Sequence, residues 1–491
     1  MITLLRGGWL AAWDGAQHRI IERGEVAFQG GQILYAGPRF EGHAGEVIDR
    51  PKWFLCPGFI NLHGHVGVDP MAPLVDTPRG GGFAPGPEFV ENAPLTMEPT
   101  LSLEEQQLSG EFCLVQMVRT GTTTVVDAHG YGAIWWLGNP PTDEAALADT
   151  VGRIGCRAYL ALGFRSARSY QDHQGRSRQH WDEEMGRAGL REGLRFALEH
   201  RGRYDGRVQT LLTPHAVEKL TPELLQATLA EARAAGLPIQ IHVAQSLNEV
   251  HLIRQRHGVT PVGLLHQLGF LGPDIVLGHC FFVDSHPAVG GDSDQDLRLI
   301  ADSGSSVAHA PLAFARRDAE VLHSLPRYLD AGINVGIGCD IWPGDIISEM
   351  RLAWLLGKHA HGDVDRPTCL EVFTAATVGS ADALQRSDLG RLAPGARADI
   401  VCVDLSGYHI GPVLDPVRAL IAFGEGRDVD RVYVEGQPIV DRGKVLHADE
   451  EKLRAAAPGI LHKLHRAAAQ RDPLGRTAES ILNPGPAPRQ A

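Results

Sequence analysis

The central part of this chain, residues 58–389, repeats one pattern, in which a short apolar run is followed by a stretch with helical periodicity. The apolar runs include TTVVDAH, PIQIHVA, DIVLGHC and NVGIGCD. Such alternation predicts a parallel β-sheet covered by helices, and unbroken apolar strands fit a sheet that is buried on both faces. The alternation alone leaves open a closed barrel or an open, doubly wound sheet. No Gly-rich dinucleotide fingerprint follows the early strands, which disfavours the Rossmann form of the open sheet.

The two ends of the chain differ from the centre. Residues 1–57 and 390–448 contain β-rich runs broken by Gly and Pro, and GEVAFQGGQILYAG predicts a hairpin around Gly30-Gly31. We therefore predict one small β-domain built from both segments, and a helix with an irregular tail over 449–491. Residues 66–100 predict a long Gly- and Pro-rich loop after the first central strand, and loops of this length often serve as lids.

Two central helices carry clear boundary signals. Thr221 and Pro222 are suited to begin one helix and Gly236 to end it. Ser102 and Glu105 form the capping-box pattern of another helix.

Composition narrows the class of protein. The chain has 491 residues, 43 % of them hydrophobic and 21 % charged, which is enough for a large core. The net charge of −13 argues against nucleic acid or an anionic membrane as the main partner. The seven cysteines form no CxxC pair, and no run resembles a signal peptide or a membrane span. We expect a cytoplasmic homo-oligomer that acts on a small molecule.

Candidate metal ligands begin in the first central strand. FINLHGH places His63 and His65 two residues apart, so both side chains lie on one face of a strand. Two imidazoles on one face form a chelating pair, and Gly64 between them leaves room. Taken alone, the pair could equally be two surface histidines in a chain that has 23.

Three further residues change this balance, because each ends an apolar run: His242, His279 and Asp340. The carboxyl ends of barrel strands face the active site. Imidazole and carboxylate ligands without a thiolate suit one divalent transition metal, zinc first, with iron, manganese, cobalt or nickel as alternatives. At such a site Asp340 is suited to accept a proton from water. His279 is suited to hydrogen-bond the tetrahedral oxygen.

Two motifs, PGFINLHGH at 57–65 and PGARADI at 394–400, closely resemble those of the amidohydrolase superfamily, and the resemblance spans nearly the whole chain. It implies a distorted (β/α)₈ barrel beside a β-sandwich. It also implies one or two divalent metal ions that activate water against C–N, C–O or C–Cl bonds. One branch of the superfamily is mononuclear and includes cytosine, guanine and adenosine-type deaminases and triazine hydrolases. In that branch His279 would contact the hydrolytic water, and the metal ligands would be His63, His65, His242 and Asp340.

Binuclear members of this superfamily usually add a carboxylated lysine or a glutamate from the middle of the barrel. This chain has six lysines, and none ends a central strand. Lys219 comes closest, but it follows His215 in an expected loop. We therefore expect one metal ion per chain.

One position departs from the deaminases of this branch, which resemble one another in a His-x-x-Glu motif after the fifth strand. Here the stretch is HVAQ, with Gln245 in place of the glutamate. Glutamine forms hydrogen bonds but cannot shuttle a proton, and loss of a general acid–base typically costs about 10²–10⁴-fold in rate. Either Asp127, His129 or His215 supplies the proton, or the reaction needs less ring protonation. We expect Glu249 on the following helix, too far away to substitute.

The remaining candidates are substrate contacts: Gln245, His215, His129 and Trp342. His215 resembles a substrate-orienting histidine of the deaminase branch. Trp342 follows the strand of Asp340 and is placed to wall the pocket, whereas we interpret His309 as a structural residue.

Three hypotheses follow. Residues 242–351 are similar to phenylurea hydrolases and to the thiocarbamate hydrolase that acts on molinate. The first hypothesis is therefore a hydrolase of a urea, amide or carbamate-type C–N bond in a small neutral molecule. The second is a deaminase or chlorohydrolase of a nitrogen heterocycle such as a triazine, purine or pyrimidine. The third, an inactive relative that binds partners, is disfavoured because every metal-ligand position is filled.

Overall fold

The structure is a computed structural model that describes residues 1–68, 89–90, 100–128, 144–171, 177–291, 293–318, 320–469 and 477. The chain is an α/β protein, as the alternation predicts. The predicted loop 66–100 and the predicted tail lie mostly outside the described residues. In the described part of the chain, no helix combines the length and the apolar character needed to cross a membrane.

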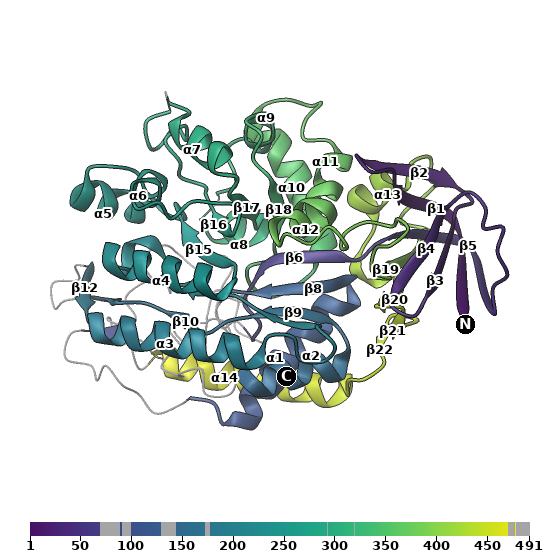
Figure 1. The fold of residues 1–491 in the computed structure, drawn as a ribbon, viewed down its shortest axis with the longest axis horizontal. Helices are drawn as coiled ribbons and strands as arrows, with labels where there is room; N and C mark the ends of the chain where they lie inside the picture. The colour runs from purple at the N-terminus through teal and green to yellow at the C-terminus, as the bar shows by residue number, and fades with distance from the viewer. Residues whose placement is uncertain are drawn as a thin grey trace, which may run out of the picture.

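Both ends of the chain contribute to one nine-stranded sheet, in the order β22-β21-β20-β19-β5-β1-β3-β4, with β2 paired to β1. Its strands lie together at one end of the molecule (Figure 1). The two halves meet where β19 pairs antiparallel with β5, and the predicted hairpin at Gly30 is β3–β4. The strands are β1 (Ile2–Trp13), β2 (His18–Glu22), β3 (Glu25–Gln29), β4 (Gln32–Gly37), β5 (Glu46–Pro57), β19 (Ile400–Asp404), β20 (Val429–Val434), β21 (Gln437–Asp441) and β22 (Lys444–Val445).

The central region forms two four-stranded parallel sheets, β13-β9-β8-β6 and β15-β16-β17-β18. Isolated parallel bridges connect their edges, Gly64 with Asp340 at one side and Leu212 with Ile239 at the other. The strands are β6 (Phe59–Gly64), β8 (Thr122–Asp127), β9 (Arg157–Leu160), β13 (Val208–Thr210), β15 (Ile239–Val243), β16 (Ile275–His279), β17 (Ser306–His309) and β18 (Val335–Ile337).

Helices follow most central strands, and both predicted capping patterns are confirmed. The Thr221 side chain accepts a hydrogen bond from Leu224, and Gly236 ends that helix with a φ of 62°. Ser102 and Glu105 form a complete capping box. The helices are α1 (Leu103–Arg119), α2 (Glu144–Ile154), α3 (Glu183–His200), α4 (Pro222–Ala235), α5 (Leu247–His257), α6 (Pro261–Gln267), α7 (Gln295–Ser303), α8 (Pro311–Asp318), α9 (Leu325–Asp330), α10 (Ile346–His361), α11 (Cys369–Thr374), α12 (Ser380–Ala383), α13 (Pro416–Phe423) and α14 (Glu450–Ala469).

Short elements complete the described fold. Ala375–Gly379 forms a π-helical turn between α11 and α12, and two 3₁₀ turns cover Val217–Lys219 and Gly426–Asp428. The short strands are β7 (Phe89–Val90), β10 (Gly163–Phe164), β11 (Ala167–Gln171), β12 (Ser177–Trp181) and β14 (Thr213–Pro214).

A buried ion-pair network joins the central strands to the terminal sheet. Arg157, fully buried in β9, donates to the carboxylates of Asp399 and Glu435. A buried guanidinium is tolerated only when such partners satisfy it. The network gives Asp399, in the PGARADI motif, a structural role.

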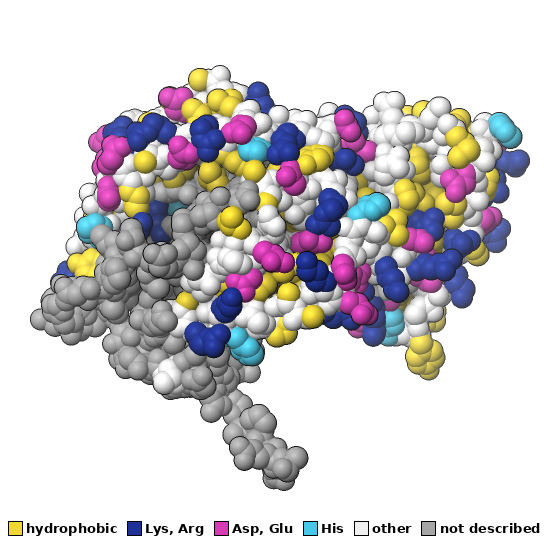
Figure 2. Space-filling view, turned by 90° about the horizontal axis from the view of Figure 1, so that it is seen from below, with side chains coloured by type: hydrophobic (Ala, Val, Ile, Leu, Met, Phe, Trp, Pro, Cys, Tyr) yellow, Lys and Arg dark blue, Asp and Glu magenta, His cyan; other side chains and the backbone are white. Residues whose placement is uncertain are grey.

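Charges of both signs are interspersed on the face shown in Figure 2. Exposed ion pairs of the protein include Arg191–Glu184 at 2.7 Å and Arg195–Glu199 at 2.8 Å. Exposed pairs of this kind contribute at most about 1 kcal/mol each, so the buried core carries most of the stability.

Candidate metal centre

The segment that follows β18 is hydrogen-bonded to β6 and its C-terminal end at the centre of the site, and we call this contact the β6–β18 seam. Asp340 donates its backbone N–H to the carbonyl oxygen of His63 at 2.8 Å, and His65 donates its own to the carbonyl oxygen of Asp340 at 2.7 Å. The Asn61 side chain strengthens the seam, because its Oδ1 accepts from the backbone of His63 and of Cys339. The backbone therefore places the two histidines and the aspartate next to one another.

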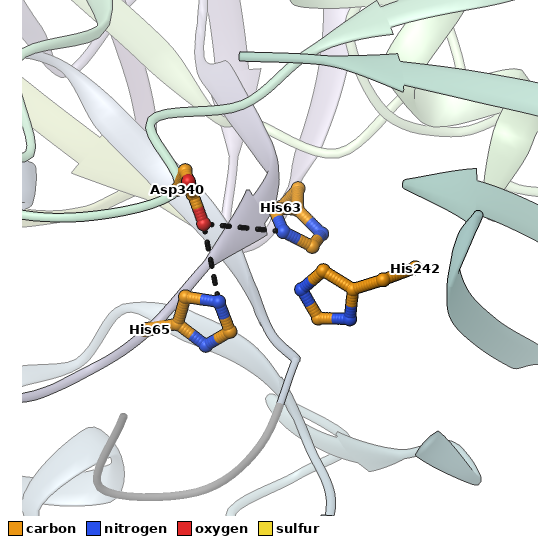
Figure 3. Close-up of side chains that lie close together, drawn as sticks. All are labelled: His63, His65, His242 and Asp340. Atoms are coloured by element: carbon orange, nitrogen blue, oxygen red, sulfur yellow. Dashed lines mark ion pairs between the residues drawn. The ribbon is translucent and has the colours of Figure 1, made fainter. Parts of the chain in front are cut away.

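Four side chains from three strand ends converge there: His63, His65, His242 and Asp340 (Figure 3). One ligand atom from each lies within 4.8 Å of all the others. The Nε2 atoms of His63 and His65 lie 3.4 and 3.1 Å from Asp340 Oδ1. Ligands about 2.0–2.1 Å from a tetrahedral zinc ion would lie about 3.3 Å from each other, so the spacing fits a single ion.

The outer hydrogen bonds of the site also fit a metal ion. His242 Nδ1 lies 2.7 Å from the carbonyl oxygen of His215, which can only accept, so Nδ1 carries the proton. The other ring nitrogen then has a lone pair, and one nitrogen of this ring points toward the other three side chains (Figure 3). A carbonyl partner of this kind typically orients a metal-binding histidine.

Asp340 is a carboxylate in this environment. Burial opposes its charge, but when no metal ion is bound, hydrogen bonds from protons on His63 Nε2 and His65 Nε2 outweigh burial and hold the pKa of Asp340 well below its usual value. The negative charge of Asp340 therefore persists at neutral pH and favours a cation among the four side chains.

Backbone strain concentrates where β15, β16 and β18 end. Ala244, His279, Cys280 and Asp340 have φ values of 51°, 75°, 50° and 57°. Non-glycine residues rarely adopt this left-handed region, and each costs of order 1–3 kcal/mol unless the surrounding structure holds it. Such clustering is typical of functional sites.

His279 lies beside the four-residue cluster. Its ring centroid is 4.7 Å from that of His63 and 5.1 Å from that of His242. Phe314 and Phe281 cover the ring from other sides at 4.7 and 5.6 Å. The position suits the predicted contact with water or a tetrahedral oxygen, and that role stays a prediction.

Gln245 lies two residues after the end of β15 and is half-buried. Glu249, on the first turn of α5, accepts hydrogen bonds from the backbone of Ala244 at 2.7 Å and of Gln245 at 2.9 Å. Both carboxylate oxygens of Glu249 thus bind the backbone of the turn. Burial, followed by the charge of Glu218, raises the pKa of Glu249 well above its usual value.

The other predicted substrate contacts differ in position. His215 lies near the cluster, with its ring centroid 5.6 Å from that of His242 and its Nδ1 3.5 Å from Arg165 Nη1. Trp342 follows Asp340 by two residues and is half-buried, and its ring centroid lies 6.3 Å from that of Phe112. His129 lies outside the described residues.

The two remaining candidates, Asp127 and His309, lie in surroundings that suit a structural role. The Asp127 carboxylate accepts from the backbone of Val66 at 3.2 Å and so supports the chain just after His65. His309 is buried, and burial lowers its pKa to about 3.

The sequence analysis missed two buried polar residues that contact the site, Asn61 and Gln240. Asn61 accepts from the backbone of His63, and the Gln240 amide contacts the His63 ring. The available signal was a polar residue inside an apolar run, as in PIQIHVA for Gln240. That signal marks a buried polar group but does not name its partner.

Comparison with known proteins identifies related sequences and structures of similar fold. A 5'-deoxyadenosine deaminase of Methanosarcina acetivorans is 29 % identical over 437 residues, which cover 88 % of this chain and 91 % of the relative. A zinc-bound adenosine deaminase structure from Xanthomonas campestris matches 94 % of this chain and 98 % of its own, with a TM-score of 0.74 at 22 % identity. A zinc-complexed atrazine chlorohydrolase from Arthrobacter aurescens matches 94 % and 100 %, with a TM-score of 0.72 at 22 % identity. The family model described as "Amidohydrolase family" matches residues 54–439, and the chain therefore belongs to the amidohydrolase family.

Proposed function

We propose that this protein is a metal-dependent hydrolase that breaks an exocyclic C–N bond of a nitrogen heterocycle and leaves a hydroxyl or keto group in its place. The observation that carries the proposal is the convergence of three imidazoles and one carboxylate within 4.8 Å. The heterocycle is supported by the deaminase that this chain resembles over 88 % of its length.

The residues that would hold the ion are His63, His65, His242 and Asp340. A single divalent ion suits this set, and zinc is supported by the zinc-bound structures of similar fold. When bound, such an ion makes water a nucleophile near neutral pH.

Asp340 and His279 would perform the proton transfers and charge stabilisation. Asp340 is ionised and therefore able to accept a proton from the attacking water, and it can then pass that proton to the departing nitrogen. The overall balance is one water consumed and one amine or ammonia released. The position of the His279 ring beside His63 and His242 supports a hydrogen bond from that ring to the tetrahedral oxygen, a contact typically worth 10²–10³-fold in rate (~3–4 kcal/mol).

Gln245 favours a second candidate, the hydrolysis of a urea, amide or carbamate. The carboxylate closest in sequence, Glu249, has both oxygens engaged with the backbone of Ala244 and Gln245. Neither residue is therefore placed to protonate a ring nitrogen from this turn. Acyclic carbonyl substrates require no ring protonation, so they remain the alternative class.

The finer fold is part of the proposal. We infer that the two central sheets close into one (β/α)₈ barrel over 58–389, supported by the bridges at both edges. A cluster of buried side chains drawn from strands of both sheets also supports closure, including Ile60, Val126, Tyr159, Val276 and Ala308. Residues 1–57 and 390–448 would form the accompanying β-sandwich domain, and 449–491 a C-terminal extension. The cytoplasmic location and the homo-oligomeric state stay predictions.

Product release from a defined panel tests the function. Zinc-loaded protein would be incubated with 5'-deoxyadenosine, adenosine, atrazine, a phenylurea and a thiocarbamate, and ammonia, amine and chloride would be measured. Ammonia from a purine nucleoside that disappears in His242→Ala supports the proposal. Turnover of the urea or thiocarbamate alone would establish the second candidate, and no turnover of any heterocycle across a broader panel would refute the first.

A further inference from the structure

Gln240 is a fully buried amide on β15, two residues before His242 and in contact with His63. The geometry points to Gln240 as a positioning residue that fixes which nitrogen of His63 carries the proton. This inference rests on the metal site of the proposed function, and it assigns a role to a residue outside the four ligands.

Two contacts determine the orientation of the amide. Its nitrogen Nε2 lies 2.7 Å from the carbonyl oxygen of Leu62, which can only accept a hydrogen bond. The amide oxygen Oε1 is therefore the atom that lies 3.1 Å from His63 Nδ1. Because Oε1 can only accept, His63 must donate, and Nδ1 carries the proton.

The consequence appears at the opposite side of the ring. A neutral His63 protonated on Nδ1 has a lone pair on Nε2, and that atom faces Asp340 Oδ1 at 3.4 Å (Figure 3). His63 Nε2 is buried and has no hydrogen-bond partner among the described residues. Two acceptors that face each other repel, and a cation between them turns the repulsion into attraction.

Without Gln240, the same ring can move its proton to Nε2 and donate it to Asp340. In that form His63 and Asp340 are joined by a hydrogen bond in place of a metal ion, so this tautomer competes with metal binding. Gln240 therefore suppresses the competing tautomer of His63.

Neighbouring side chains and backbone hold the His63 ring in place. The hydrogen bond to Gln240 therefore determines which ring nitrogen carries the proton. The ring centroid of His63 lies 4.8 Å from that of His242 and 4.7 Å from that of His279. A Cβ at Gly278 would come within 3.2 Å of His63 Cε1, so β16 also lies directly against the ring. The ring is thus enclosed, and rotation away from Asp340 is hindered.

Cobalt(II) binding tests the inference independently of turnover. We would measure affinity by competition with a chromophoric chelator, and ligand geometry from the visible spectrum of the cobalt protein. Gln240→Met keeps the size but cannot accept the Nδ1 proton, and we expect 10- to 100-fold weaker binding, as is typical when the partner of a metal-bound histidine is lost. Gln240→Glu keeps an acceptor, and we expect its affinity to lie closer to wild type.

Gln209→Met serves as the matched control, because Gln209 lies in β13, outside the metal site, and its amide donates a hydrogen bond to the Gly206 carbonyl at 2.8 Å. Circular dichroism verifies folding of each variant. Wild-type affinity in Gln240→Met would overturn the inference alone, and so would equally weak binding in Gln240→Glu. If Gln240→Met does not fold, Gln240→Glu decides by the same criterion. Failure of the wild type to bind cobalt would overturn the proposed metal site itself.

Discussion

Replacing Gly338 with alanine should weaken metal binding although it replaces none of the four proposed ligands. Gly338 lies between β18 and Asp340, and its N–H donates to the His309 carbonyl at 2.9 Å. A Cβ at this position would lie 2.6 Å from the carbonyl oxygen of His63 and 2.7 Å from its Cβ. Those atoms belong to a central strand and cannot swing aside. The strain would therefore pass to the seam between β6 and β18.

The size of the displacement follows from these distances. Ordinary van der Waals contact begins at 3.4 Å, so relief of the 2.6 Å contact requires a shift of 3.4 − 2.6 = 0.8 Å. Functional side chains must usually be held within about 0.5 Å, and overpacking costs about 1–3 kcal/mol. We expect Gly338→Ala to bind metal at least tenfold more weakly, because Asp340 moves away from His63 and His65.

The assay is metal affinity by chelator competition, with thermal denaturation to confirm folding. Gly459→Ala is the control, since a Cβ there meets no described atom within 4 Å. A Gly338→Ala protein with wild-type affinity and wild-type turnover would refute the claim that the β6–β18 seam sets the geometry of the site.

Other predictions address the reaction, the metal and the fold. His279→Asn should retain metal but lose about 10²–10³-fold in kcat, measured by product release, and parallel loss of metal would make His279 a ligand instead. Removal of metal with a chelator should abolish turnover, and zinc should restore it. Burial, followed by the Arg391 charge, lowers the pKa of His18 to about 4 from 6.5. A depressed folded-state pKa means that stability is present above pH 6.5 and is lost as pH falls toward 4, by about 3 kcal/mol. Urea unfolding of His18→Gln should lack that component, and an unchanged pH dependence would contradict it.

The site was predictable from the sequence where local periodicity carries the information. His63 and His65 share a strand face because of their two-residue spacing, and His242 and Asp340 each end an apolar run. The parallel arrangement of those runs brings their carboxyl ends to one edge. Family motifs then supplied the expectation that these positions belong to one site.

What escaped prediction depends on contacts between residues far apart in the sequence. Gln240 appears as one polar residue in an apolar strand, and only the fold shows that it meets Leu62 and His63. Glu249 was expected on the helix after β15, but its hydrogen bonds to the backbone of Ala244 and Gln245 depend on the angle between strand and helix. No periodicity encodes that angle.

The terminal sheet also combines predictable and unpredictable features. The strand-rich composition of both chain ends and the hairpin at Gly30 were predicted from the sequence. The pairing of β19 with β5, with Ile400 opposite Pro57, joins segments more than 300 residues apart and follows from the path of the whole central region. Sequence texture predicts strands, but it does not predict which distant strand becomes the neighbour.

The most direct test of the account is the metal content of the purified protein, measured by plasma mass spectrometry on wild type and Asp340→Ala prepared without added metal. The account predicts about one transition-metal ion per wild-type chain and a clear reduction in Asp340→Ala. Two ions per wild-type chain, or none even after incubation with zinc, would contradict a single metal centre formed by His63, His65, His242 and Asp340.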